Sequence, residues 1–176
     1  SSGNFGGATL ALVNPGTLLS LNIAPNATPS AAYFKGSIDN KWNTFTGGNA
    51  NNSNWATTSA GTTDTNAAPG ATTDVHFYTS NATTGNLATS LGRNFTIQSL
   101  TLDGGTLGNN VSIASGGGIL TIAPGTISAG ITVNGGAGSL AITAPVILGA
   151  SQTWTNNAAS PMTVSGGVTG AASLAL

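Results

Sequence analysis

Short apolar bursts of three or four residues recur along the C-terminal half of the chain, and Gly, Pro, Ser or Asn ends each one. Side chains alternate across a strand, so the outer residues of an apolar-polar-apolar triplet face one side. No window of ten or more residues carries the three-and-four spacing of an amphipathic helix. The pattern predicts an all-β protein of short strands. The triplets are FTI at 95, LTL at 100, VSI at 111, LTI at 120, ITV at 131, LAI at 140, VIL at 146, MTV at 162 and LAL at 174.

The spacing of these triplets favours one all-β architecture. Starts at 111 and 131 are 20 residues apart, as are starts at 120 and 140, and the start at 162 follows 22 residues later. A common period predicts a coil of parallel strands, a β-solenoid with turns of about 20 residues. A β-sandwich would favour longer strands, of about five or six residues, joined by hairpins. The predicted interior residues are Ile119, Leu120, Ile122, Ile127, Ile131 and Val133.

The regularity of the pattern divides the chain into three regions. Residues 1–24 contain LALV and LLSLNI, which predict N-terminal β-solenoid strands, and residues 95–176 predict regular solenoid turns. Residues 25–94 form a polar region that contains aromatic residues, and they predict a long ordered loop or a small capping sheet beside the coil. Its expected anchors are Trp42, Phe45, Trp55, Phe77 and Tyr78.

The two ends of the chain share a motif. GGATLAL at 6–12 and GAASLAL at 170–176 agree at five of seven positions, including Leu10 with Leu174 and Leu12 with Leu176. A coil of strands has open ends whose backbone groups invite pairing unless they are capped. The echo predicts end-to-end assembly through these strands, as a head-to-tail homopolymer or a tandem array, and chance similarity in a simple sequence is the alternative.

Composition excludes several partners. The chain is 39% hydrophobic and only 4% charged, and its cations are Lys35, Lys41 and Arg93. Three cations are too few to neutralise a row of phosphates, so nucleic acid is not an expected partner. Membrane insertion is not expected either, because no apolar run approaches the roughly 18 residues that a spanning helix needs. Without cysteine there is no disulfide framework and no thiolate metal site.

The order of motifs resembles the autotransporter-associated β-strand repeat of bacterial surface and secreted proteins. The matching passages are KWNTFTGGNANNSNW, PGATTDVHF, FTIQSLTLDGG, GGILTIAPGTI, ITAPVILGASQTWTNN and PMTVSGGVTG. The most specific of them places a Trp between an apolar strand and a closing V-S-G-x-V-x-G. The resemblance implies a right-handed parallel β-helix, export to the cell surface or the extracellular space, a passive role and no catalytic residues.

Enzyme chemistry has little support in the sequence. A pectate-lyase-like enzyme on a parallel β-helix would need clustered acids, whereas the four carboxylates are scattered at Asp39, Asp64, Asp74 and Asp103. Asp64 and Asp74 would meet only across a loop, and Asp74 shares a strand face with His76 at i, i+2. A turn aspartate and a loop histidine are the favoured interpretation. We expect no catalytic residue, no metal and no cofactor.

The aromatic residues suggest one binding hypothesis. Trp42, Trp55 and Tyr33 would form a platform for surface glycans if their rings were exposed, and the alternative is that they anchor the long loop to the coil. Trp154 is expected to pack against a face of the coil. The leading hypothesis is a self-associating structural unit of an extracellular bacterial fibre or surface protein. A glycan-binding adhesin is second, and a pectate-lyase-like enzyme is a distant third.

Overall fold

A computed structural model describes the backbone of residues 2–5, 8–13 and 20–25, and the backbone and side chains of residues 27–46, 52–78, 82–103, 108–125 and 129–176. Almost all of the regular structure in these ranges is β. The exception is a single 3₁₀ turn, η1 (Thr84–Asn86). The prediction of an all-β chain is therefore confirmed for the described residues.

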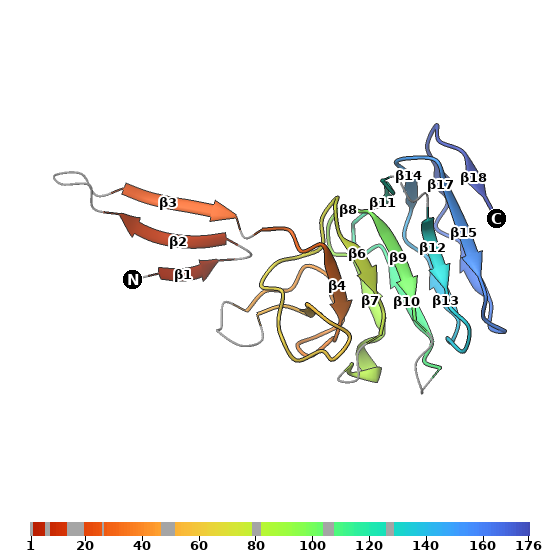
Figure 1. The fold of residues 1–176 in the computed structure, drawn as a ribbon, viewed down its shortest axis with the longest axis horizontal. Helices are drawn as coiled ribbons and strands as arrows, with labels where there is room; N and C mark the ends of the chain where they lie inside the picture. The colour runs from red at the N-terminus through yellow and green to blue at the C-terminus, as the bar shows by residue number, and fades with distance from the viewer. Residues whose placement is uncertain are drawn as a thin grey trace.

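Three parallel sheets form a β-solenoid (Figure 1). Sheet 1 contains β7 (Ala88–Ser90), β10 (Val111–Ala114), β13 (Leu140–Ile142) and β16 (Met162–Val164). Sheet 2 contains β8 (Phe95–Ile97), β11 (Leu120–Ile122), β14 (Val146–Leu148) and β17 (Val168–Thr169). Sheet 3 contains β4 (Ala31–Phe34), β6 (Asp74–His76), β9 (Ser99–Leu102), β12 (Ala129–Val133), β15 (Gln152–Asn156) and β18 (Leu174–Ala175), and β5 (Trp55–Ala56) lies on its outer edge.

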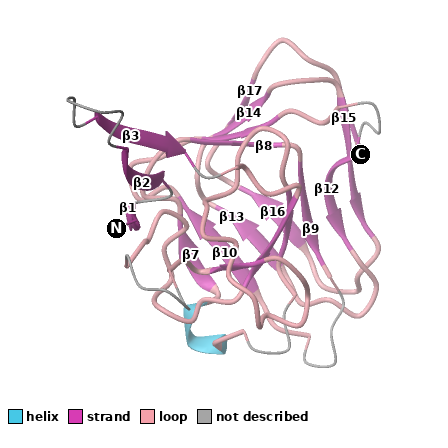
Figure 2. Cartoon of the chain, turned by 60° about the vertical axis from the view of Figure 1, so that its left-hand side comes forward, coloured by secondary structure: helices cyan, strands magenta, loops and turns pink. Residues whose placement is uncertain are grey.

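Each turn of the coil contributes one strand to each sheet, and there are about four turns of roughly 25 residues (Figure 2). This corrects the prediction that each turn has about 20 residues and that triplets 20 residues apart are neighbours on successive turns. The triplet at 111 pairs with the one at 140, and the triplet at 120 pairs with the one at 146. The strands at 111 and 131, like those at 120 and 140, therefore lie in different sheets. Only the 22-residue step from 140 to 162 joins neighbours in a ladder.

The core is a narrow column of apolar side chains inside the three sheets. Leu120, Ile122, Ile131 and Val133 are fully buried, as the alternation predicts. Ile119 is half-buried, and Ile127 lies outside the described residues. The expected packing of Trp154 is confirmed, because its side chain is 5% exposed and it stands in register with Ile131.

Glycine occupies corners where one turn lies directly on the next. A Cβ at Gly118 would collide with the backbone of Arg93 in the preceding turn, and one at Gly166 would collide with the carbonyl of Ala144. The coil can therefore stack at the spacing of a β-ladder only if these corners carry no side chain.

The N-terminal strands differ from the prediction for residues 1–24. β1 (Ser2–Phe5), β2 (Ala8–Val13) and β3 (Ser20–Pro25) form an antiparallel sheet of their own, which lies apart from the coil in Figure 1. Two residues separate β1 from β2 and six separate β2 from β3. Such connections suit hairpins, whereas a parallel pair needs a crossover of about a dozen residues or more.

The predicted loop or capping sheet is present but shorter than residues 25–94. It comprises the chain between β4 and β6, residues 35–73, which we call the cap. β4 and β6 themselves pair in parallel within sheet 3, and β7 belongs to sheet 1. Within the cap, β5 runs antiparallel to β4, which ends the parallel order of sheet 3.

The two ends of the coil differ in burial. One inward column of sheet 2 places Phe95, Leu120, Val146 and Val168 on successive turns. Val146 is fully buried, whereas Val168 in the last turn is 40% exposed. At the other end of this column the ring of Trp42 covers Phe95, with ring centroids 5.4 Å apart. Within the described residues, the column is thus covered at the cap and exposed at β16–β18.

Candidate functional site

The most distinctive surface lies on the outward face of sheet 3, near the cap. Tyr33 of β4 and His76 of β6 stand in register on neighbouring strands. Their rings stack with centroids 4.5 Å apart and planes inclined by 14°. This stacking follows from the ladder, because side chains in register on adjacent parallel strands point the same way at the strand spacing.

His76 is joined to a carboxylate on the next turn. Its Nδ1 lies 2.8 Å from Oδ2 of Asp103, and the amide Nδ2 of Asn134 donates to Oδ1 of Asp103 at 3.0 Å. Asp103 follows β9 and Asn134 follows β12, so both side chains lie where neighbouring parallel strands end. The carboxylate is held from both sides, yet the side chains of His76 and Asp103 remain 21% and 26% exposed.

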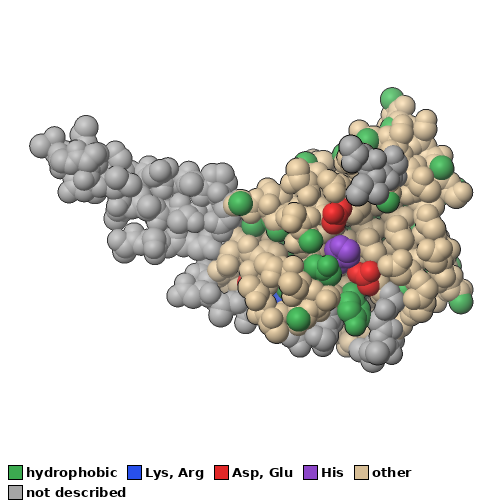
Figure 3. Space-filling model, viewed as in Figure 1, with side chains coloured by type: hydrophobic (Ala, Val, Ile, Leu, Met, Phe, Trp, Pro, Cys, Tyr) green, Lys and Arg blue, Asp and Glu red, His purple; other side chains and the backbone are tan. Residues whose placement is uncertain are grey.

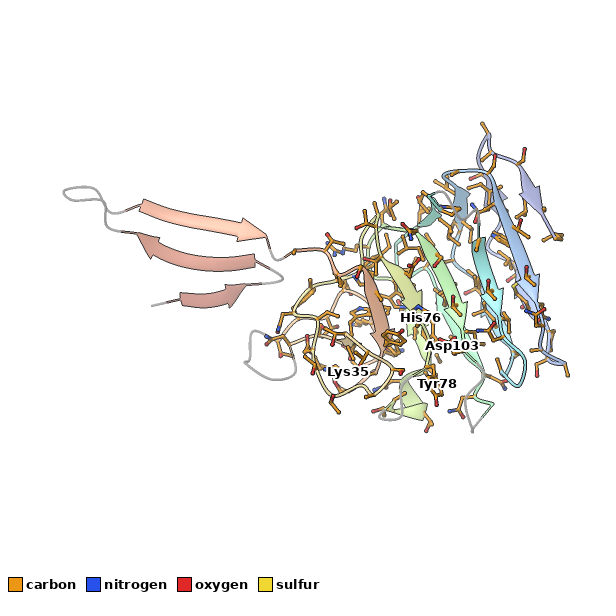
Figure 4. All side chains as sticks on the ribbon, viewed as in Figure 1. Lys35, His76, Tyr78 and Asp103 are labelled. Carbon is orange, nitrogen blue, oxygen red and sulfur yellow. The ribbon has the colours of Figure 1, made fainter. Side chains whose placement is uncertain are left out.

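These residues border a surface hollow of about 400 Å³ that also includes Tyr78 and Ser59. A second hollow of about 210 Å³ lies on the other side of His76 and is lined by Asp74 and Gln98, among others. His76 lines both hollows, and we call the two hollows together the groove. Figure 3 shows the histidine on this face with carboxylates on both sides, and Figure 4 shows His76, Tyr78 and Asp103 grouped at the ends of neighbouring strands.

The carboxylates considered in the sequence have separate partners in the described residues. Asp74 and His76 share the outward face of β6, as the i, i+2 spacing predicts, but the hydrogen bonds of Asp74 come from Gln98 Nε2 at 3.1 Å and Ser99 Oγ at 2.6 Å. Asp64 is instead buried in the cap, where Lys35 Nζ lies 2.8 Å from its Oδ2. Within the described ranges no three His, Asp or Glu side chains gather as metal ligands.

Ser59 and the His76–Asp103 pair are residue types that occur together in serine hydrolases. Activation of a serine requires a hydrogen bond between its hydroxyl and the histidine. Among the described contacts none joins Ser59 to His76, whose hydrogen bond is made to Asp103. The arrangement therefore orients a carboxylate and an imidazole at the surface.

Two of the three candidate glycan-binding aromatics are core residues. Trp42 and Trp55 are fully buried, and their rings meet edge to face at 5.0 Å. Trp42 Nε1 donates to Thr89 Oγ1 at 3.1 Å, and Trp55 Nε1 donates to the carbonyl of Trp42 at 3.0 Å. Neither indole offers a face to a sugar, so the anchoring alternative describes these two residues. Tyr33 alone of the three borders the groove.

The sequence did not reveal the rest of the groove. Tyr78 was expected to anchor the loop, yet it is 37% exposed at the groove. His76 and Asp103 are separated by 27 residues, and Asp103 and Asn134 by 31. Only the register of sheet 3 brings them together, and a sequence with irregular corners does not display that register.

A dense polar network holds the cap in place. Asp64 accepts hydrogen bonds from the backbone N–H and the hydroxyl of Ser53, at 2.9 and 2.8 Å, as well as from Lys35. The buried Asn54 accepts from the N–H of Asp39 at 3.2 Å and donates to its Oδ1 at 2.6 Å. These buried polar atoms of the cap therefore have partners, whereas the buried Oδ1 atoms of Asn43 and Asn52 have none among the described residues.

The pKa of the Asp39 carboxyl in the cap is shifted from its ordinary value. Burial acts to raise its pKa, but hydrogen bonds from the Lys41 N–H, the Thr44 hydroxyl and the Asn54 amide, with the charge of Lys41, outweigh burial. The pKa is consequently lowered below its ordinary value, and the charged carboxylate belongs to the folded cap.

No protein-family model, curated protein or solved structure matches this chain. Within the described residues, no helix has the length and apolar character to cross a membrane.

Proposed function

We propose that this chain is a structural module of an extracellular bacterial fibre or cell-surface protein. We further propose that its last turn is a stacking surface for another layer of β-strands, supplied by a further repeat in a tandem array or, for the isolated chain, by a second copy. The observation that carries this proposal is the open column of sheet 2. Val146 is fully buried beneath Val168, whereas Val168 is 40% exposed and continues the same inward row. A further layer of strands would bury it as each turn buries the one before.

The backbone supports the same surface. Val146, Leu140 and Gln152 donate their N–H groups to carbonyls of the following turn, at 2.9, 3.1 and 2.9 Å. Their register partners in the last turn are Val168, Met162 and Leu174. By the same ladder pattern, those three N–H groups point toward the open end. Unpaired strand edges of this kind are templates for pairing with another chain.

The cap argues against head-to-tail stacking. A head-to-tail contact would place the last turn of one copy on the first turn of another, where β5 and the buried Trp42 and Trp55 already cover the coil. β2, which carries Leu10 and Leu12, is paired on both edges, by β1 and β3. For two isolated copies, a contact between their last turns about a two-fold axis fits these observations better than head-to-tail stacking. Such isologous contacts are the commonest in homo-oligomers.

The composition supports a passive structural role. With 4% charged residues, few groups titrate or respond to salt, so the stability of the coil should vary little with either. That tolerance suits a protein exposed outside the cell, as does the resemblance to autotransporter-associated repeats. A surface module of this kind needs no catalytic residue or cofactor.

Sedimentation velocity over a range of concentrations tests the association. The Val168→Lys/Leu174→Lys variant places two charges on the inward side of the open end, where association would bury them. We expect a dimer for the wild type and at least about tenfold weaker association for the variant, because burying an unpaired charge is costly. The matched control is Thr169→Lys/Ala175→Lys, which changes exposed, outward positions on the same two strands and should leave the dimer intact.

Three results would contradict the proposal. A wild type that stays monomeric at every concentration removes the association. Equal weakening by the outward and inward lysines shows that the contact lies elsewhere. An open-ended series of oligomers would mean that the cap accepts a second copy, contrary to its closed geometry.

A further inference from the structure

The groove on sheet 3 has features that the structural role does not require. We infer that it binds a neutral sugar unit of a glycan, with Tyr78 as the apolar contact and Asp103, held by His76 and Asn134, as the hydroxyl acceptor. This inference concerns the opposite end of the coil from β16–β18 and is independent of the proposed association.

The first support is the size and rigidity of the site. The hollow of about 400 Å³ falls in the range of about 300–1,000 Å³ that is usual for small-molecule sites. Tyr33 and His76 in its wall stand in register on neighbouring strands of sheet 3, and Asp103 and Asn134 directly follow the next two strands of that sheet. Groups on a hydrogen-bonded ladder need little reorganisation on binding, which lowers the entropic cost.

The second support is the chemistry of the polar groups. A sugar presents neighbouring hydroxyls, which donate to a carboxylate and accept from amide and imidazole N–H groups. Asp103 has each oxygen fixed by one neighbour, at 2.8 Å to His76 and 3.0 Å to Asn134. Each carboxylate oxygen has a second lone pair, so the group can still accept from a ligand. Such an oriented acceptor favours a polyhydroxyl ligand over an apolar one.

The third support is the aromatic surface. Tyr78 is 37% exposed and lines the hollow, and the stacked Tyr33 and His76 form its adjoining wall. An exposed tyrosine ring offers a flat apolar contact at low conformational cost, which suits the C–H face of a sugar ring. The polar and the apolar contact thus lie in one hollow.

The charge of the groove restricts the class of sugar that it can bind. The described residues that line the two hollows include Asp74 and Asp103 but neither lysine nor arginine. Lys35 is engaged with Asp64 in the cap, and Arg93 lies over the ring of Phe95. An acidic sugar would meet carboxylates without a compensating cation, so a neutral sugar is favoured.

The chain has so few histidine and tyrosine residues that their NMR signals report selectively on the groove. His76 is the only histidine, and Tyr33 and Tyr78 are the only tyrosines. All three line the groove. The imidazole and tyrosine ring signals in an NMR spectrum of the full chain therefore report on this site alone.

The test is an NMR titration of the full chain with a panel of neutral oligosaccharides of glucose, galactose, mannose and N-acetylglucosamine. We expect at least one of them to shift the His76 and Tyr78 signals saturably. Tyr78→Ala and Asp103→Ala should each weaken that binding at least about tenfold, as expected when a ring contact or a charged hydrogen bond is lost. Tyr78→Phe should retain binding within about twofold, because it keeps the ring.

Thr155→Ala is the matched control, because Thr155 lies in the outward row of sheet 3 three strands away from His76. It should bind as the wild type does. Variants are compared only when their circular dichroism and thermal transition match the wild type. If Tyr78→Ala fails to fold, Tyr78→Leu carries the test of the ring, because it removes the ring but keeps an apolar side chain.

The following results would overturn the inference. A folded wild type whose His76 and Tyr78 signals respond to no neutral sugar has no such site. Shifts that appear only with uronic acids or amino sugars show that charge, not the neutral hydroxyl pattern, is recognised. Shifts with Zn²⁺ or Ca²⁺ alone and not with sugar would show an ion site, and cleavage of a bound oligosaccharide would show catalysis instead of binding.

Discussion

The same apolar column is covered at one end of the described solenoid and exposed at the other. At the cap, Trp42 lies over Phe95 and β5 turns the edge of sheet 3 antiparallel. At the last turn, Val168 and Leu174 continue the inward rows with nothing described above them. The cap shows that a segment outside the repeat can cover a solenoid, because it supplies bulk and hydrogen-bond partners.

The two ends of the described solenoid also differ in residue composition. The cap buries Ser53, Asn54 and Asp64 and connects them by hydrogen bonds to its own backbone. The last turn uses small and hydroxylated residues, and its sequence from 160 to 176 has no ionisable side chain. A satisfied polar network can fix one conformation of a non-repeating loop, whereas a repeating rung is fixed by its neighbour.

The largest effect is expected from removing the indole that closes the column. Trp42→Ala should lower the free energy of unfolding by about 3–5 kcal/mol, because a large buried ring is replaced by a cavity at the cap. The corresponding change at the open end, Val168→Ala, should cost less than about 1 kcal/mol, because Val168 is partly exposed.

Urea unfolding of both variants measures this difference, at a concentration where the wild type is monomeric. Equal losses would show that the two ends contribute alike and that the cap does not close the coil.

The buried ion pair of the cap should give the next largest effect. Lys35→Met leaves the Asp64 carboxylate in a site where the two side chains are 2% and 3% exposed. We expect a loss of about 3 kcal/mol, since a buried charge without its partner is costly. Arg93→Met is the matched cation control, and it should cost less than about 1 kcal/mol because Arg93 is exposed above Phe95.

Thermal and urea unfolding of the two variants measures whether the buried ion pair stabilises the cap. A Lys35→Met protein as stable as Arg93→Met would mean that the pair contributes nothing to the closed end. It would also mean that the cap rests on its aromatic residues alone.

Local alternation predicted the interior of the coil better than spacing predicted its turns. The inward positions of the triplets at 120, 131 and 140 are buried because alternation is a property of each strand by itself. Which strands are neighbours depends on the corners, and register steps along the coil vary from 22 residues between Leu140 and Met162 to 31 between Leu100 and Ile131. The equal spacing of 111–131 and 120–140 therefore arose between strands of different sheets.

The same dependence on register explains which parts of the groove could be predicted from the sequence. Asp74 and His76 share a strand, so their common face was predictable from two-residue alternation. The contact between His76 and Asp103 depends on the register of β6 on β9. The buried tryptophans were ambiguous because an aromatic residue in a polar loop serves equally as an anchor or as a binding platform. Only the position of the cap over the core distinguishes these roles.

The smallest effect concerns the pH dependence of the cap. The lowered pKa of Asp39 means that its charged form is favoured in the folded state, so its stabilisation is fully present above the carboxyl's ordinary pKa. It is lost as the pH falls through the lower, folded-state pKa. Asp39→Asn should therefore be less stable than the wild type near neutral pH, by no more than about 1 kcal/mol. The difference should shrink as the pH falls below about 4.

Denaturation midpoints of the wild type, Asp39→Asn and Thr163→Ala across this pH range measure the dependence. Thr163 lies on the outward side of β16 at the open end, where no ionisable side chain is near in sequence. Thr163→Ala should follow the pH profile of the wild type, because it leaves every titrating group in place. A wild type and an Asp39→Asn variant separated by a constant interval at every pH would show that Asp39 holds the cap by hydrogen bonds alone, without any contribution from its charge.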